Sequence, residues 1–134
     1  MGKQILFPPL ALFTAVSLFA ADGAPAPKPL FRDPVHDGAA DPVVVWNPHV
    51  KAWWMFYTNR RANATNASGV AWVHGTRLGI AESTNQGVNW GYVGTAEIDL
   101  ALGCGGTNVT QWAPEVVAAP DGLHHLLLTV VPGV

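Results

Sequence analysis

Two segments of the chain repeat one strand-turn-strand pattern 72 positions apart, and this repeat constrains the fold more than any other sequence feature. The first segment reads DPVVVW, NPHVK and AWWMFYTN, and the second reads APEVVAAPDGLHHLLLTVV. Aligned without a gap, they match Pro42 with Pro114, Val44 with Val116, Val45 with Val117 and Pro48 with Pro120. Repeated strand-turn-strand units predict a β-propeller. The same matches also fit two unrelated hairpins in a β-sandwich.

The residues between the repeats complete one unit of strands at roughly 41–94. DPVVVW is apolar on both faces, which is typical of a strand covered on both sides, and AWWMFYTN continues as a second buried strand. After the loop NRRANATNASG, the segments GTRLGIAES and NWGYVG predict two further strands, and a second unit begins near Gln111. We therefore predict an all-β fold with about one and a half propeller blades of four-stranded antiparallel sheet.

The first residues have the layout of a secretory signal peptide. Lys3 precedes the apolar run ILFPPLALFTAVSLFA, and small residues follow it. This run of 16 residues contains two prolines, which is short and broken for a membrane span of about 20 residues. A retained membrane anchor is the alternative. We assign 1–21 to a signal peptide, 22–30 to a proline-rich linker and 31–134 to the propeller domain, and we predict a secreted or periplasmic protein without a membrane anchor after cleavage.

The length of the predicted domain fits only part of a propeller. A blade takes about 40 to 45 residues, and a closed ring needs at least about four blades. The sequence also ends in the apolar run HHLLLTVVPGV, with no polar tail. We therefore expect an N-terminal fragment of a longer protein, inactive by itself, whose unpaired strand edges favour aggregation or a partner. The sequence does not predict the oligomeric state.

The composition is typical of a dense β-structure and argues against nucleic-acid binding. Charged residues make up 12% of the chain, against about 25% in ordinary globular proteins. The formal net charge is −2, and the only basic cluster is Arg60-Arg61, which more plausibly ends a strand than binds phosphate. Cys104 is the single cysteine, so no disulfide forms within the chain.

The segment STNQGVNW, residues 83–90, resembles the Asp-box hairpin S-x-D-x-G-x-x-W of sialidases and related propellers. Asn85 stands where that family has Asp, but its side-chain oxygen can still accept hydrogen bonds from turn amides. Gly87 permits a positive φ, and Trp90 is expected to pack beneath the turn. The motif is structural, and it predicts a propeller-type hairpin between the third and fourth strands.

Several motifs in the expected order resemble the N-terminal part of the five-bladed propeller glycosidases of glycoside hydrolase family 43. They are Asp41-Pro42 at the first strand, FYTNR at the end of the second, GIAES before the Asp-box-like turn, and QWAPEVV at the next blade. The likeness covers residues 31–134. It implies a five-bladed propeller that hydrolyses O-glycosidic bonds of plant or algal oligosaccharides, typically with inversion at the anomeric carbon.

In that family pattern Asp41 matches the carboxylate that serves as general base. The base must stay ionised, so polar surroundings are expected around it. The general acid and the aspartate that tunes its pKa belong to later blades and are not found in this sequence. Asp33-Pro34 is a competing motif without a β-branched strand after it, so we prefer Asp41. The plainer reading of Asp41 is a turn or strand-start residue, a common role for Asp before Pro.

Six further residues are candidates for binding substrate. The candidates are Trp112 and Glu115 in the WAPE motif, Arg32 and Asp37 near Asp41 in the sequence, and His74 and Arg77 before the third strand. An indole ring can stack on a sugar, while imidazole and guanidinium groups suit hydroxyl and carboxylate groups. The alternatives are that Trp112 packs between blades and that His74 and Arg77 face solvent at a strand end.

No cofactor or metal site is predicted, and carbohydrate is the expected ligand. Neighbouring strand residues point to opposite faces, so His124 and His125 cannot comfortably bind one ion, and His36, Asp37 and Asp41 lack a ligand-like spacing. Relatives in the resembled family sometimes hold a structural calcium ion, and nothing in this sequence locates one. Asn63, Asn66 and Asn108 each begin a glycosylation sequon.

Two other functions remain open from the sequence. A noncatalytic carbohydrate-binding propeller would keep the tryptophan-rich strands and the Asp-box-like hairpin without needing Asp41. A sialidase-like hydrolase is suggested by the Asp box, but the arginines of the chain do not form the cluster with which that class holds a carboxylate. Arabinofuranosides, xylosides and galactans are all open as substrates.

Overall fold

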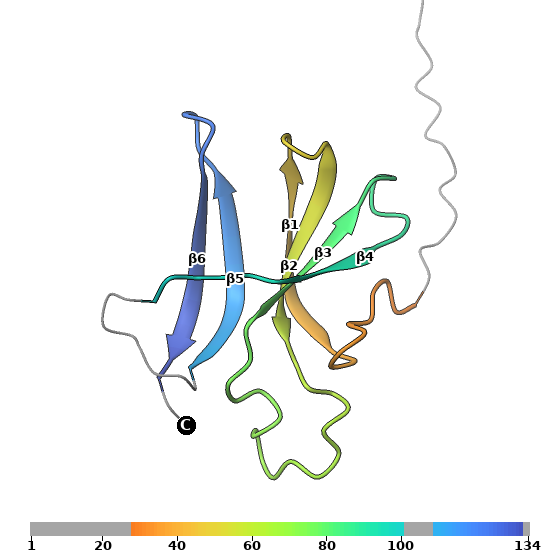
Figure 1. The fold of residues 1–134 in the computed structure, drawn as a ribbon, viewed down its shortest axis with the longest axis vertical. Helices are drawn as coiled ribbons and strands as arrows, with labels where there is room; N and C mark the ends of the chain where they lie inside the picture. Colours follow the sequence, from red (N-terminus) through yellow and green to blue (C-terminus); the bar gives the residue numbers. More distant parts are fainter. Residues whose placement is uncertain (1–27, 101–108, 133–134) are drawn as a thin grey trace, which may run out of the picture.

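The computed structural model describes residues 28–100 and 109–132, which form six β-strands (Figure 1). The strands are β1 (Ala39–Asn47), β2 (Ala52–Asn59), β3 (Leu78–Ser83), β4 (Gly91–Thr95), β5 (Thr110–Ala118) and β6 (His124–Val131). The predicted signal peptide, residues 22–27 of the predicted linker, Cys104 and Asn108 lie outside the described residues. No helix in the described part of the chain is long and apolar enough to cross a membrane.

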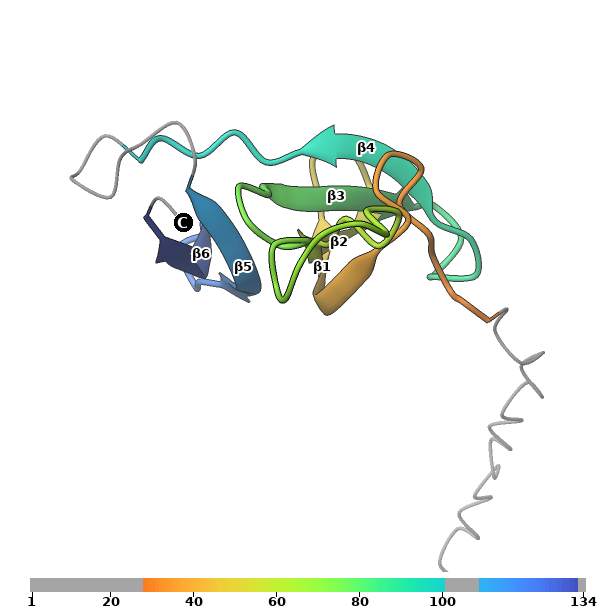
Figure 2. The same ribbon diagram turned by 90° about the horizontal axis from the view of Figure 1, so that it is seen from below.

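The strands form two antiparallel sheets, which confirms the predicted all-β fold. The first sheet has four strands in the order β1-β2-β3-β4, and the second pairs β5 with β6. β1 and β2 lie against β5, and Figure 2 shows the chain running from β4 toward the second sheet. β1 is an edge strand of its sheet: it pairs with β2 on one side and contacts β5 of the second sheet.

The two sequence repeats share the position of their second strand and of a bulge in their first strand. Residues 52–59 of β2 and 124–131 of β6 are 72 positions apart along their whole length. Asp41 and Ala113, the residues before the two aligned prolines, have φ angles of +48° and +49°. Each lies in a β-bulge, between Ala40 and Val43 in β1 and between Trp112 and Glu115 in β5. The repeat is therefore structural, and Asp41 lies inside β1 rather than at its opening.

The two hairpins differ in register by one residue. Val44 pairs with Met55 in the first hairpin, whereas Val116 pairs with Leu126 in the second. An offset of 72 would place Leu127 opposite Val116, but the second turn encloses residues 119–123 and the first only 48–51. The longer turn shifts β6 by one position and thereby moves its apolar side chains relative to those of β2.

Each face of the four-stranded sheet carries its own apolar cluster. Met55, Tyr57 and Ala81 are buried on one face, where Phe31 and Trp90 pack against them. On the other face, residues of β3 and the segment after β4 pack with β2 and β6 and join the two sheets: Leu78, Ile80, Ala96, Trp54, Phe56, Ile98, Leu126 and Leu128. The residues before β1 therefore cover one face, and the second sheet covers the other.

The expectation that the first two strands are covered on both faces is wrong for the described residues. Val44 and Trp46 of β1 are 46% and 43% exposed, and Trp53 of β2 is 36% exposed. Side chains alternate between faces along a strand, so these three lie on the face with Met55 and Tyr57 and are left partly open there. The apolar pattern predicted the strands correctly but not the extent of their cover.

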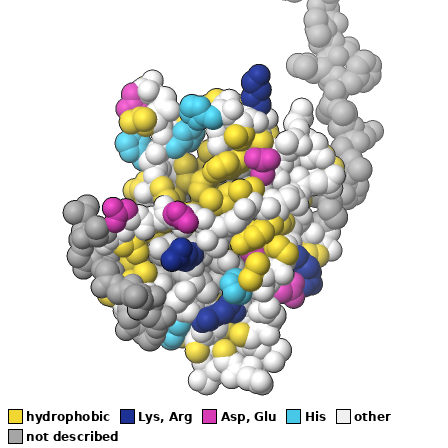
Figure 3. Space-filling view, viewed as in Figure 1, with side chains coloured by type: hydrophobic (Ala, Val, Ile, Leu, Met, Phe, Trp, Pro, Cys, Tyr) yellow, Lys and Arg dark blue, Asp and Glu magenta, His cyan; other side chains and the backbone are white. Residues whose placement is uncertain are grey.

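A second apolar surface follows the seam between the sheets. A groove of about 240 Å³ there is lined by side chains that include Trp54, Phe56, Val116, Leu126 and His124. Figure 3 shows apolar side chains gathered over this part of the face with histidines beside them. His125 is not among the groove residues, as strand alternation predicts for the neighbour of His124.

The Asp-box-like turn forms the predicted hairpin between β3 and β4. The Asn85 side-chain oxygen accepts a hydrogen bond from the Asn89 N–H at 2.9 Å, and the Ser83 hydroxyl accepts one from the Gly87 N–H at 2.9 Å. Gly87 has a φ of +85°, and the Trp90 indole donates to its carbonyl at 3.1 Å. Asn85 thus forms the turn at the position where the Asp-box pattern has Asp.

Asp33 organises the turn before β1 from a buried position. Its carboxylate accepts hydrogen bonds from the N–H groups of Val35 at 2.8 Å and His36 at 2.7 Å. The Tyr57 hydroxyl donates to its other oxygen at 2.5 Å, and both Asp33 and Tyr57 are almost fully buried. Burial, followed by the hydrogen bond to the Asp33 carboxylate, raises the pKa of the Tyr57 hydroxyl far above its ordinary value.

This raised pKa predicts a loss of stability in alkaline solution. Above pH about 10 the unfolded chain releases the Tyr57 proton while the folded chain keeps it, so the free energy of unfolding falls as pH rises, by at most about 1.4 kcal/mol per pH unit. Urea unfolding between pH 8 and 11.5 measures the slope. Tyr57→Phe should flatten it. An equal slope in Tyr57→Phe and in the wild type would contradict the prediction.

Candidate functional site

The candidate site is built around the Asp41 carboxylate, where β1 bulges toward the second sheet. The bulge leaves Asp41 with a positive φ, a conformation that Asp adopts more readily than most residues. The Asp41 side chain is 50% exposed. Its position at an edge strand and its exposure make this carboxylate accessible to a ligand or to water.

Two polar side chains from the end of β2 surround this carboxylate. The Thr58 hydroxyl donates a hydrogen bond to Asp41 Oδ2 at 3.1 Å, and Arg60 Nη2 lies 4.0 Å from the same oxygen. Ala40 pairs with Thr58 across the hairpin, so the next residue, Asp41, lies beside the end of β2. Thr58 and Arg60 therefore give the Asp41 carboxylate polar surroundings.

Arg60 is held in place by the long loop between β2 and β3. Its guanidinium lies 4.9 Å from the ring centroid of Trp72, which is cation–π geometry. Arg61 fixes that loop by donating to the carbonyl oxygens of Ala71, at 2.8 Å, Trp72, at 3.3 Å, and His74. Arg60 therefore lies beside Asp41, and Arg61 holds the loop together. This agrees with the prediction that Arg60-Arg61 ends a strand rather than binding phosphate.

The second sheet reaches the same site through β5. The Ala113 N–H donates to the Thr58 hydroxyl oxygen at 2.8 Å. Further along β5, the Thr110 hydroxyl accepts from the Gly75 N–H at 2.8 Å, and the Gln111 N–H donates to the Thr76 carbonyl at 2.9 Å. Three hydrogen bonds therefore fix the start of β5 against the four-stranded sheet.

The structure does not bring the predicted binding residues into hydrogen-bonding contact with Asp41. Arg32 and Asp37 form an exposed ion pair with each other. Trp112 is half-buried and pairs with Thr129 of β6, while Glu115 is exposed opposite Leu127. His74 is half-buried in the loop that Arg61 organises, and its carbonyl accepts from that arginine. Within the described residues, only Thr58 donates a hydrogen bond to the Asp41 carboxylate.

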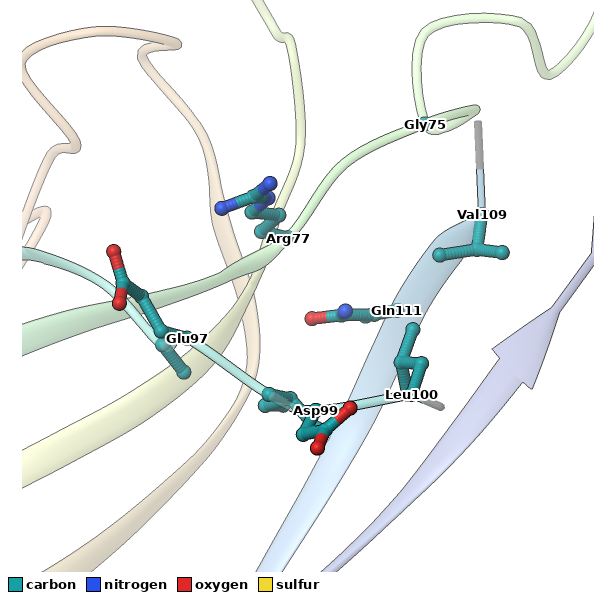
Figure 4. Close-up of a pocket in the computed structure, with 9 residues that line it drawn as sticks. Gly75, Arg77, Glu97, Asp99, Leu100, Val109 and Gln111 are labelled. Carbon is teal, nitrogen blue, oxygen red and sulfur yellow. The ribbon is translucent and has the colours of Figure 1, made fainter. Parts of the chain in front are cut away.

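Arg77 lines a separate cavity of about 600 Å³ whose lining does not include Asp41. Figure 4 shows Arg77, Glu97, Asp99 and Gln111 around this space, contributed by the approach to β3, the segment after β4 and β5. Gln111 is buried, and its side-chain oxygen has no hydrogen-bond partner among the described residues. The sequence pointed to Arg77 but not to Glu97 or Asp99, which lie in no motif, and it named Gln111 only as the start of the QWAPEVV motif.

Sequence reasoning also missed Thr58 and Arg60 as neighbours of Asp41. Both lie in the FYTNR segment, and a hairpin turn of known length would have paired this segment with the residues around Asp41. In the parts of the chain that the structure describes, no group of three or more His, Cys, Asp or Glu side chains could hold a metal ion.

No known family model and no curated protein matches this chain. The resemblance of residues 31–134 to family 43 glycosidases therefore remains a prediction from the sequence motifs.

Proposed function

We propose that this chain is part of a secreted glycoside hydrolase of the five-bladed propeller type, with Asp41 as its general base. The observation that supports it most is the exposed Asp41 carboxylate, bound by the Thr58 hydroxyl and 4.0 Å from Arg60 in the bulge of β1. The substrates would be oligosaccharides from plant or algal polysaccharides. The bond cleaved is the O-glycosidic bond, and the reaction inverts the anomeric carbon.

The surroundings of Asp41 suit the removal of a proton from water. Thr58 binds Oδ2, and Oδ1 has no hydrogen-bond partner among the described residues. Oδ1 can therefore accept a hydrogen bond from a water molecule. It would take a proton from that water as the water oxygen attacks the anomeric carbon of the sugar. In inverting enzymes this water attacks from the face opposite the leaving group, and a general acid about 6.5 to 9.5 Å from the base protonates the leaving oxygen. The proposal assigns the base alone.

The repeated bulge supports the propeller part of the proposal. β1 and β5 begin at the same end of the two sheets, and each carries a positive-φ residue before proline close to that end (Figure 1). In a propeller the corresponding strand ends of successive blades meet around one opening. Asp41 would then face that opening, which is where the proposed substrate would bind.

The test is a hydrolysis assay of the full-length protein as its gene encodes it. Aryl α-L-arabinofuranosides, β-D-xylosides and β-D-galactosides are offered separately, and proton NMR records the anomer released first. We expect hydrolysis of at least one substrate with inverted configuration. A first product of retained configuration would contradict the inverting mechanism, and the absence of hydrolysis of all three aryl substrates would contradict the proposal.

A noncatalytic sugar-binding function has one observation in its favour. Trp46 and Trp53 lie edge to face, with ring centroids 5.5 Å apart and an interplanar angle of 65°, and both rings are exposed. They line a hollow of about 380 Å³ together with Lys51, Thr84 and Gln86. Aromatic faces with a few polar groups are a common lining for small-ligand sites. Such a site would bind a sugar at the turn end of the first hairpin.

For this sugar-binding function, Trp53→Ala is expected to weaken oligosaccharide binding at least about 10-fold, since about 1.4 kcal/mol of stacking would be lost. Isothermal titration calorimetry with xylo-, arabino- and galacto-oligosaccharides measures the affinity. Leu127→Ala removes an apolar side chain, 56% exposed, from β6 outside this hollow and should leave the affinity unchanged. Equal affinities of Trp53→Ala and the wild type would exclude the tryptophan pair as a sugar site.

A further inference from the structure

The hydroxyl group of Thr58 joins the Asp41 carboxylate to the second sheet. Thr58 is completely buried. Its oxygen lies 3.1 Å from Asp41 Oδ2 and 2.8 Å from the Ala113 nitrogen. These two neighbours come from different sheets, and 55 residues separate Thr58 from Ala113 in the sequence. One side chain therefore contacts both bulges of the repeat.

The direction of the hydroxyl proton follows from its neighbours. A backbone N–H can only donate, so the Thr58 oxygen must accept from Ala113. A hydroxyl has a single proton. Because the Ala113 amide proton points at the Thr58 oxygen, the hydroxyl proton of Thr58 is available to point at Asp41. An ionised carboxylate only accepts, which matches this arrangement. The Ala113 N–H therefore orients the Thr58 hydroxyl so that it donates to Asp41.

The position of the Ala113 N–H is set by the second sheet. Ala113 has a φ of +49° in the bulge of β5. Earlier in the same strand, Thr110 and Gln111 are hydrogen-bonded to Gly75 and Thr76. A shift of β5 would move this N–H and release the Thr58 hydroxyl. The orientation of the Asp41 carboxylate thus depends on how β5 docks against the first sheet.

We propose that Thr58 is a positioning residue that holds the Asp41 carboxylate in its working orientation and makes that orientation depend on the docked β5 strand. The catalytic consequence rests on the proposed glycosidase function, whereas the hydrogen-bonded bridge does not. Without the Thr58 hydroxyl, the Asp41 side chain is free to close the 4.0 Å gap to Arg60. A direct ion pair with the guanidinium would occupy the carboxylate and turn it away from water.

The test compares Thr58→Val, which keeps the shape of the side chain but removes the hydroxyl, with Thr58→Ser, which restores it. Ser83→Ala is the matched control, because Ser83 is another buried hydroxyl that accepts a backbone N–H, from Gly87 at 2.9 Å, but it lies in the turn between β3 and β4 and takes no part in the docking of β5. We expect Thr58→Val to lower kcat about 10- to 100-fold, as misplacement of a reacting group does, with little change in KM. Thr58→Ser and Ser83→Ala should keep kcat within about 3-fold of the wild type by the same reasoning.

A second measurement tests the bridge without any assay of activity. The carboxyl carbon signal of Asp41 and the amide signal of Ala113 are followed by NMR in the full chain. Both should move in Thr58→Val and stay in place in Ser83→Ala. If Thr58→Val does not fold, Asp41→Ala, a change at an exposed side chain, should move the Ala113 signal but not the Gly75 signal.

The outcomes separate this inference from the proposed function. An inactive wild type whose Asp41 and Ala113 signals respond as expected would support the bridge and reject the glycosidase. An active wild type whose Thr58→Val variant keeps its kcat would reject the role of Thr58 and leave the glycosidase standing. Unchanged Asp41 and Ala113 signals in Thr58→Val would reject the bridge itself.

Discussion

Asp41→Asn is expected to lower kcat/KM for glycoside hydrolysis by about 10²- to 10⁴-fold, the range for removal of a general base. An amide cannot take a proton from water at neutral pH, so the attacking water would keep its proton and remain a weak nucleophile. The Asn side chain has the same shape as Asp, and its oxygen can still accept the hydrogen bond from Thr58. Because the side chain is half-exposed, we expect the thermal midpoint to change little. Initial rates and thermal unfolding of both proteins measure the two effects.

Asp121→Asn provides the matched control for this charge change. Asp121 lies in the turn between β5 and β6, where its side-chain oxygen accepts a hydrogen bond from the Leu123 N–H at 3.0 Å. An Asn side chain keeps this acceptor, so both activity and stability should stay at the wild-type level. If Asp41→Asn retained more than half of the wild-type kcat/KM, Asp41 would not be the base, even with hydrolysis established for the wild type.

The strands and turns of this fold follow from short sequence patterns. AWWMFYTN predicts a strand over the residues that β2 occupies, and the 72-residue repeat predicts its counterpart β6. The Asp-box-like turn was also predictable, because Asn85, Gly87 and Trp90 act within a few residues of one another. These features depend on local hydrogen bonds and on the alternation of side chains along a strand, and both are visible in the sequence.

The bulges and the contacts between the sheets were not predictable in the same way. The residue before a proline is usually extended, so the positive φ of Asp41 and Ala113 contradicts the local preference. The bond between the Thr58 hydroxyl and Ala113 depends on how two sheets dock. The sequence therefore identified Asp41 as a candidate but not the Thr58 and Arg60 side chains that lie beside its carboxylate.

The exposure of β1 and β2 has a similar cause. An apolar run such as DPVVVW predicts a strand that suits cover on both faces, but it does not specify which element supplies the cover. In the described residues, Phe31 and Trp90 cover the part of the face near Tyr57 and leave Trp46 and Trp53 open. The exposure of Trp46 and Trp53 thus depends on tertiary packing, and measurements of oligosaccharide binding test whether the pair binds sugar.

Gly79→Ala is expected to lower the free energy of unfolding by about 3 to 5 kcal/mol, the largest effect on stability that we predict. Gly79 pairs with Tyr57 across β2 and β3, and a Cβ atom there would overlap the Tyr57 ring and lie 2.5 Å from its hydroxyl oxygen. The ring cannot move aside without breaking its 2.5 Å hydrogen bond to the buried Asp33 carboxylate. Overpacking costs about 1 to 3 kcal/mol, and a lost hydrogen bond to a charged group costs about 1.5 to 3 kcal/mol.

Urea unfolding of three variants separates this clash from a general effect of alanine in a strand. Gly91→Ala, in the neighbouring strand β4, is the control, because the nearest atom to its added Cβ would be the Glu82 carbonyl oxygen at 4.0 Å. It should change stability by less than about 1 kcal/mol. In a Tyr57→Ala background the added methyl group at Gly79 has room, so Gly79→Ala should then cost little, and the two sites should show strong coupling. A loss no larger than that of Gly91→Ala would mean that Tyr57 does not constrain residue 79, and that the buried hydrogen bond to Asp33 does not hold the ring where the first sheet requires it.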